Sequence, residues 1–123
     1  MQSQQELLAT VYAAFNRRDI DAVLALMRPD VDWPNGMDGG RVHGRDEVRA
    51  YWQRQWGLID PRVEPVRMQD DETDTVVDVH QVIRDLSGKI LKDQLVQHIY
   101  SFRDGLIERM DIRDPDARAA HEG

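Results

Sequence analysis

The stretch DQLVQHIYSFRDGLIERMDIRD, residues 93–114, decides the fold prediction because apolar and polar residues alternate along both of its halves. Alternation with a period of two is typical of a strand that buries one face. The pair Asp104-Gly105 separates the halves, and an Asp-Gly pair between two alternating runs predicts a tight antiparallel hairpin. A strand that only fills a core has little use for polar groups, so His98 and Asp111 raise the question of function.

The pairing register of this hairpin determines whether His98 and Asp111 meet. With a two-residue turn, the ladder places His98 directly opposite Asp111, within reach of a hydrogen bond. A three-residue loop with a bulge at Gly105 instead places His98 opposite Met110 and turns Asp111 to the other face. We favour the bulged register because it gives the second arm a more apolar inner face. Even then His98 can line a pocket, because one face of the first arm carries Val96, His98, Tyr100 and Phe102.

The rest of the chain is predicted as helices followed by strands. The spacing of apolar residues and the turn signals predict helices at 4–17, 20–28 and 45–56, a short strand and a loop within 31–44, and strands at 62–69, 74–85, 90–103 and 106–114. We expect residues 115–123 to form a frayed tail. This order predicts a single α+β domain over residues 1–123, with its helices gathered on one face of an antiparallel sheet.

The composition limits the class of function. A length of 123 residues allows one compact domain, and the net charge of −7 makes nucleic acid an unsuitable partner because an acidic surface repels phosphate. We expect no membrane partner, since no apolar run approaches the length of a membrane span. The start of the sequence lacks a basic leader, and the absence of cysteine excludes disulfides and thiolate metal sites. Both features fit a cytoplasmic protein.

Three segments together resemble the nuclear transport factor 2-like superfamily and, within it, the SnoaL-like branch. They are NRRDIDAVLALMRPDVDW (16–33), HGRDEVRAYW (43–52) and VQHIYSFRDGLIERMDI (96–112). The resemblance covers nearly the whole chain and implies a cone-like fold, in which a curved antiparallel or mixed sheet wraps the N-terminal helices around a pocket. Members include ketosteroid isomerases, polyketide cyclases, limonene-epoxide hydrolases, dehydratases and non-catalytic binding domains, so the fold alone does not assign a chemistry.

The resemblance also implies roles for individual residues. SnoaL-like cyclases use a histidine and an aspartate from the closing hairpin, and this chain has His98 and Asp111 there, which we predict as a catalytic pair. Ketosteroid isomerases have a general-base aspartate after the second helix, and the matching position here is Asn35, which cannot take up a proton as a carboxylate does. Their oxyanion tyrosine lies on the first helix, where the alignment places Val11, with Tyr12 one step away. We therefore expect no ketosteroid isomerase activity.

The predicted substrate-binding residues are Tyr12, Trp33, Asn35, Trp56, Gln81 and Tyr100. Tryptophans can form the floor of an apolar ligand site, and the alternative is that they pack in the core or a dimer interface. Only one of His80 and Gln81 can face the pocket, and we favour Gln81 because it alternates with apolar residues. For Asp78 and Asp93 an exposed strand face is favoured over a role as pocket carboxylates. We assign His43 to the loop before the third helix.

We predict no metal and no cofactor, because the four histidines are scattered and no ligand spacing is present. Three functions remain open. The first is a cofactor-independent acid–base enzyme, an isomerase, cyclase or dehydratase acting on a small apolar metabolite. The second is a binding domain for such a molecule without catalysis, and the third is a structural dimerisation module with a filled pocket. A homodimer through the outer sheet face is expected in each case, because the closing strands carry apolar residues on both faces.

Overall fold

The computed structural model describes residues 3–36 and 38–113. The elements in chain order are α1 (Gln4–Asn16), α2 (Ile20–Leu24), β1 (Met27–Pro34), β2 (Arg41–His43), α3 (Arg45–Trp56), β3 (Ile59–Asp71), β4 (Asp74–Asp85), β5 (Ile90–Arg103) and β6 (Leu106–Arg113). The expected tail at 115–123 and the last residue of the predicted final strand lie outside the described residues.

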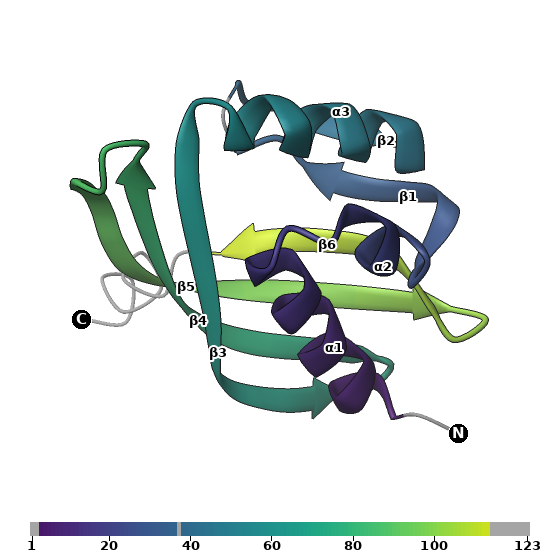
Figure 1. The fold of residues 1–123 in the computed structure, drawn as a ribbon. Helices are drawn as coiled ribbons and strands as arrows, with labels where there is room; N and C mark the ends of the chain where they lie inside the picture. The colour runs from purple at the N-terminus through teal and green to yellow at the C-terminus, as the bar shows by residue number, and fades with distance from the viewer. Residues whose placement is uncertain (1–2, 37, 114–123) are drawn as a thin grey trace.

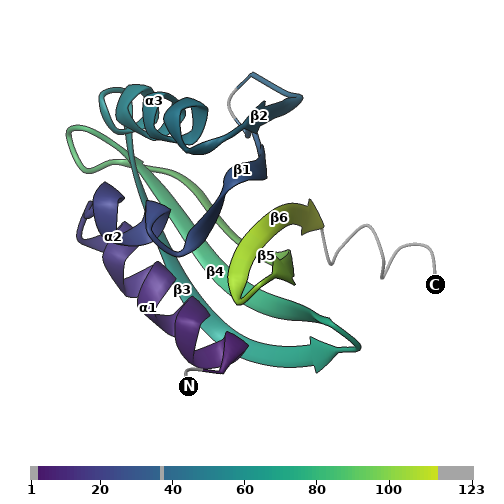
Figure 2. The ribbon, with the colours of Figure 1, turned by 90° about the vertical axis from the view of Figure 1, so that its right-hand side faces the viewer.

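The six strands form one curved sheet in the order β2-β1-β6-β5-β4-β3. All neighbouring strands are antiparallel except β1 and β6, which are parallel. The helices lie on one side of the sheet, with α1 along its concave face and α3 over the end formed by β1 and β2 (Figures 1 and 2). The predicted α+β architecture with helices on one sheet face is therefore confirmed, and the sheet is mixed.

The core lies between the helices and the inner face of the sheet. On α1, Leu8 and Ala14 are fully buried, and on β4 Val77 and Val79 are fully buried against that side. Asn16 fastens the end of α1 to β3, since its side-chain amide donates to the carbonyl of Val63 (2.7 Å) and its carbonyl accepts from the Val63 N–H (3.0 Å). This pair of bonds holds the helix at a fixed distance from the sheet, which leaves room between them.

The second helix is shorter than predicted. We expected it to run over 20–28, but α2 ends at Leu24 and β1 begins at Met27. Met27 lies beside Ile107 in the parallel ladder, and the Ile107 N–H donates to the carbonyl of Leu26 (3.0 Å). Pairing with a strand some eighty residues away in sequence therefore overrides the local helical pattern. The segment predicted as a loop also contains the short strand β2.

The register of the β5–β6 hairpin differs from both predicted alternatives. The turn itself has two residues, Asp104 and Gly105, both with positive φ (54° and 79°), as a type I′ turn requires. Phe102 pairs with Ile107, but Ser101 pairs with Arg109, so one extra residue in β6, Glu108, forms a bulge. His98 consequently lies opposite Ile112, and neither Asp111 nor Met110 is its partner.

Candidate functional site

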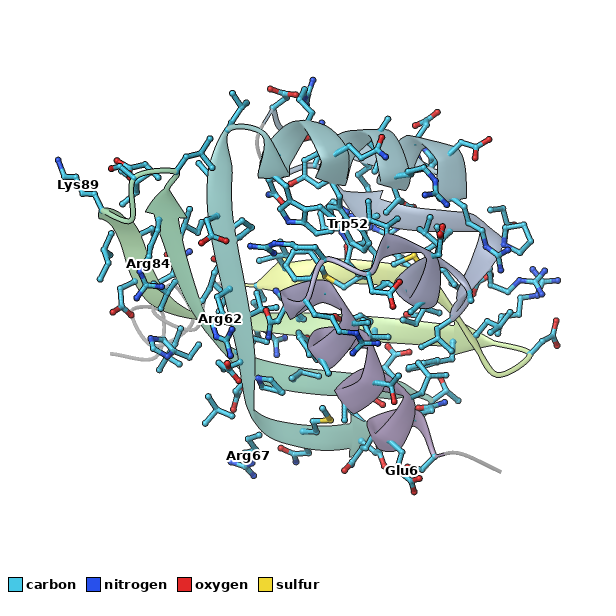
Figure 3. The ribbon with its side chains drawn as sticks, viewed as in Figure 1. Glu6, Trp52, Arg62, Arg67, Arg84 and Lys89 are labelled. Carbon is cyan, nitrogen blue, oxygen red and sulfur yellow. The ribbon has the colours of Figure 1, made fainter. Side chains whose placement is uncertain are left out.

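A cavity of about 80 Å³, partly open to solvent, lies between α1, α3 and the inner face of the sheet. Its inner wall is formed by buried aromatic rings, and Figure 3 shows Trp52 pointing from α3 toward the interior of the cone. Half-buried and exposed residues surround its mouth, among them Gln55, Gln81 and Ile112. The lining residues are Val11, Tyr12, Phe15, Trp33, Pro34, Tyr51, Trp52, Gln55, Pro61, Val63, Gln81, His98, Tyr100, Met110 and Ile112.

The lining of this cavity carries no lysine, arginine, aspartate or glutamate. Its polar groups are three tyrosine hydroxyls, two glutamine amides, two indoles and one imidazole. Gln81 accepts a hydrogen bond from Gln94 on the neighbouring strand (2.9 Å), which fixes the glutamine side chain at the mouth. A cavity with this lining favours an uncharged molecule, because burying a charge without a partner is costly.

A chain of three hydrogen-bonded side chains crosses the inner wall. The hydroxyl oxygens of Tyr100 and Tyr12 lie 2.9 Å apart, and the Tyr12 oxygen lies 2.8 Å from Nδ1 of His98. Tyr12 and Tyr100 are 3% and 1% exposed, and His98 is 6% exposed. The chain joins α1 to β5, so it fixes the orientation of the imidazole by contacts from two separate elements.

Burial controls the protonation of these groups. Loss of hydration lowers the pKa of His98 to about 4, because the charged imidazolium is disfavoured in the interior. The same cause, with the neighbouring Tyr100 added, raises the pKa of Tyr12 well above its usual value, and burial also raises that of Tyr100. At neutral pH all three groups are therefore uncharged, and they act as hydrogen-bonding dipoles rather than as ions.

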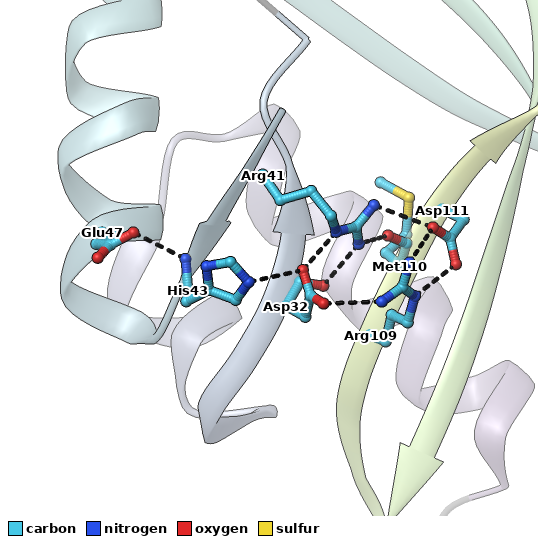
Figure 4. Close-up of polar contacts among 7 residues, drawn as sticks. All are labelled: Asp32, Arg41, His43, Glu47, Arg109, Met110 and Asp111. Atoms are coloured by element: carbon cyan, nitrogen blue, oxygen red, sulfur yellow. Dashed lines mark hydrogen bonds and ion pairs between the residues drawn. The ribbon is translucent and has the colours of Figure 1, made fainter. Parts of the chain in front are cut away.

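The structure does not bring Asp111 to His98. Asp111 pairs with Ile99 and lies on the outer face of the sheet, where its carboxylate accepts from Arg109 (2.9 Å) and Arg41 (3.0 Å). Hydrogen bonds from Arg109, together with the charges of both arginines, lower the pKa of Asp111. Figure 4 shows this outer cluster, in which Asp32 also binds both arginines. The predicted His98–Asp111 pair is wrong because the bulge in β6 turns the aspartate outward.

Two predicted substrate-binding residues also lie away from the cavity lining. Asn35 begins the turn between β1 and β2, where its side chain accepts from the Asp38 N–H (3.0 Å). From the same segment, the cavity is lined by Trp33 and Pro34. Trp56 packs against Phe15, with ring centroids 5.3 Å apart, in the aromatic layer behind the cavity. An arginine, Arg18, lies over its ring at 5.0 Å.

The other four predicted binding residues, Tyr12, Trp33, Gln81 and Tyr100, line the cavity together with His98. Sequence reasoning missed Gln55, although it lies three residues after Trp52 and so on the same helical face. The favoured bulged register placed Met110 and Ile112 on the inner face, and both line the cavity, although neither was named as a binding residue. His80 faces outward as expected and binds Asp93 (2.6 Å), and His43 lies in β2 beside Asp32 rather than in a loop.

Two structural findings concern other kinds of site. Within residues 3–36 and 38–113, no three histidine, cysteine or acidic side chains come together in a way that could hold a metal ion. In the same part of the chain, no helix is long and apolar enough to cross a membrane.

The sequence pattern of the SnoaL-like domain family matches residues 8–110, and the chain therefore belongs to this family. A structure of an NTF2-like protein of unknown function from Burkholderia pseudomallei K96243 is 27% identical, covers 98% of this chain and 97% of that chain, and has a TM-score of 0.81. TerC, co-crystallised with polyporic acid, is 28% identical over 95% of this chain and 94% of that chain, with a TM-score of 0.78.

A putative polyketide cyclase from Sinorhizobium meliloti shares the fold, with 19% identity, a TM-score of 0.76, and 87% of this chain and 93% of that chain covered. No functionally curated protein gives a significant match. The resemblance to the nuclear transport factor 2-like superfamily is thus confirmed.

We expect the stability of the protein to fall between pH 6.5 and pH 4 because of His98. Its pKa is about 4 in the folded chain and near 6.5 when unfolded, so the unfolded state binds more protons in this window. Stability therefore rises with pH here, and about 3 kcal/mol is lost as the pH falls through it. Urea unfolding at several pH values measures the slope, and NMR titration of the histidine ring measures the pKa itself.

The variant Asp111→Asn is the matched control for this titration. It removes the carboxylate that the sequence predicted to face His98 but leaves the interior unchanged, so the pKa of His98 should stay low. A His98 pKa near that of free histidine would contradict the burial of the ring, and a pKa that depends on Asp111 would contradict the observed register. The variant His98→Phe should flatten the pH slope, whatever its effect on stability at neutral pH.

Proposed function

We propose that the chain binds a small, uncharged, largely apolar molecule in the cavity between α1, α3 and the sheet. The observation that carries this proposal is a lining free of charged side chains, with aromatic rings around a single imidazole. Ligand sites have this character, with a mostly apolar wall and a few placed polar groups. TerC, which shares 28% identity with this chain, was crystallised with polyporic acid, and this supports a small-molecule ligand here.

The geometry supports binding over acid–base catalysis. A general base works best with a pKa near the working pH, whereas the pKa of His98 is about 4. Across the described residues, no carboxylate hydrogen-bonds to His98, since the ring is held by Tyr12. A purely structural role is less well supported, because side chains leave a cavity of about 80 Å³ unfilled. This is room for several water molecules or part of a small ring compound.

Binding can be tested with a set of neutral fragments in the size range of single-ring compounds. We expect some of them to shift the indole N–H signals of Trp33 and Trp52 in heteronuclear NMR spectra, because both rings line the cavity. The signal of Trp56 is the internal control, since this ring lies behind the lining. If no neutral fragment changes any lining residue at millimolar concentration, the proposed function is wrong.

We still expect no ketosteroid isomerase activity, and the structure gives a stronger reason for this than the position of Asn35. The part of β1 that lines the cavity supplies Trp33 and Pro34, whereas Asp32 binds Arg41 and Arg109 outside. We expect a Δ5-3-ketosteroid to show no increase in conjugated-enone absorbance above the buffer rate. Turnover at the rate of an isomerase would mean that another residue serves as the base.

We also propose that two copies of the chain associate through the outer face of the sheet. On this face Leu95 is 57% exposed, and Val82 and Ile99 are half-buried. The two ends of β4 differ in charge. The β3–β4 turn carries Asp70, Asp71, Glu72 and Asp74, whereas the β4–β5 end carries three basic residues, Arg84, Lys89 and Lys92, and two acidic ones, Asp85 and Asp93. Figure 3 shows Arg84 and Lys89 at the far end of that hairpin.

A two-fold axis that lies in the interface, parallel to the sheet plane and perpendicular to β4, would place the two outer faces against each other with the two β4 strands antiparallel. The basic end of one copy then lies over the acidic turn of the other, and the apolar patch covers itself. We expect sedimentation velocity to show a dimer at micromolar concentration, and Leu95→Glu to shift it to a monomer. The matched control is Val66→Glu, at an equally exposed residue of the edge strand β3. A wild-type monomer would remove this proposal.

A further inference from the structure

The hydrogen-bonded chain Tyr100–Tyr12–His98 has a direction, and that direction decides what the cavity can recognise. Two arrangements of protons are compatible with the distances. In the first, Tyr100 donates to Tyr12, and Tyr12 donates to Nδ1 of His98, so the ring proton sits on Nε2. In the second, Nδ1–H donates to Tyr12, Tyr12 donates to Tyr100, and Nε2 is an acceptor.

The two arrangements differ in which buried donor is left without an acceptor among the described residues. Each arrangement leaves one donor to be satisfied from the cavity: the hydroxyl of Tyr100, which is 1% exposed, in the second, and Nε2–H of His98, which is 6% exposed, in the first. The deeper Tyr100 hydroxyl is the harder of the two to satisfy. A buried donor without an acceptor costs more than an acceptor with a spare lone pair. In the first arrangement both hydroxyl protons are donated, and the remaining donor is Nε2–H of a residue that lines the cavity.

We propose that His98 presents Nε2–H to the cavity as a fixed donor, so that the ligand class is neutral molecules with a carbonyl oxygen that accepts this hydrogen bond. This inference rests on the proposed function and deepens it. Tyr12 and Tyr100 are positioning residues, because they act on the ligand through the imidazole. The burial that keeps the ring uncharged also keeps Nδ1 an acceptor, and therefore keeps Nε2 the donor near neutral pH.

The lining makes the same selection against charged ligands. A carboxylate ligand would find no lysine or arginine in the lining, and an ammonium ligand would find no aspartate or glutamate. The aromatic part of the wall includes Trp33 and Trp52, whose ring centroids lie 5.6 Å apart in an edge-to-face arrangement. A flat or ring-shaped body can pack against these rings while its one acceptor atom reaches His98.

The tautomer can be measured on the unmodified protein without any ligand. Long-range ¹H–¹⁵N correlation spectra of the histidine rings distinguish a protonated Nε2 from a protonated Nδ1. We expect His98 to be neutral at pH 7 with its proton on Nε2. A proton on Nδ1 would overturn the inference, because the cavity would then present an acceptor. The outward-facing His80 provides an internal reference for an exposed ring.

The ligand class is tested with cyclohexanone and methylenecyclohexane, which have the same shape and differ in a carbonyl oxygen against a CH₂ group. We expect cyclohexanone to bind roughly three- to tenfold more tightly, as one net hydrogen bond allows, with affinities read from NMR shifts of the lining residues. In His98→Phe this preference should vanish, while methylenecyclohexane binds as before. Cyclohexanecarboxylate and cyclohexylammonium should both bind more weakly than the ketone.

The outcomes separate this inference from the proposed function. Equal affinity for the two neutral compounds in the wild-type protein overturns the carbonyl class but leaves small-molecule binding intact. A preference for the ketone that persists in His98→Phe overturns the assignment to His98. Failure of every neutral fragment to reach the lining residues overturns both. If His98→Phe does not fold, the tautomer measurement and the wild-type comparison decide alone.

Discussion

One extra residue in β6 sets the chemistry of both faces of the sheet. Because Glu108 forms a bulge, Ile107 is buried near the turn, while Met110 and Ile112 face the cavity farther along. Without the bulge, side-chain alternation would send Asp111 inward and these two apolar residues outward. The bulge therefore exchanges a carboxylate for apolar groups on the cavity side, and the other properties of the site follow from this exchange.

A carboxylate beside His98 would have stabilised the imidazolium and raised the pKa of His98, whereas the observed burial lowers this pKa. The ring is instead hydrogen-bonded to Tyr12 on α1, and α1 is held at its distance from the sheet by Asn16 and Val63. The position of the His98 ring and its protonation state therefore depend on the same contacts. The contacts that create space between helix and sheet also bring the tyrosine to the one nitrogen that it can reach.

Much of this could be predicted from the sequence, because it depends on local patterns. Alternation along β5 correctly placed His98 and Tyr100 on the inner face, and the bounds of α3 and β4 agree with the helical and strand patterns. The favoured bulged register correctly turned Asp111 outward, but the position of the bulge at Glu108 instead of Gly105 could not be predicted, since Leu106, Ile107, Met110 and Ile112 offer apolar residues in more than one register. The end of α2 and the bond from Tyr12 to His98 depend on partners some eighty residues away, which no local pattern encodes.

The bulge also explains why the charges of this end of the sheet lie together outside. Asp32, Arg41, Arg109 and Asp111 form one cluster across β1, β2 and β6, and they are partly exposed (Figure 4). Such pairs add little to stability, because water and salt screen them. These ion pairs affect the cavity indirectly, through the protonation state of Asp111. The arginines lower the pKa of Asp111 and so keep it charged and satisfied outside, where it has no tendency to enter an apolar space. The field inside the cavity is then set by the dipoles of its own wall, and selection among ligands depends on shape and on hydrogen bonds to neutral groups.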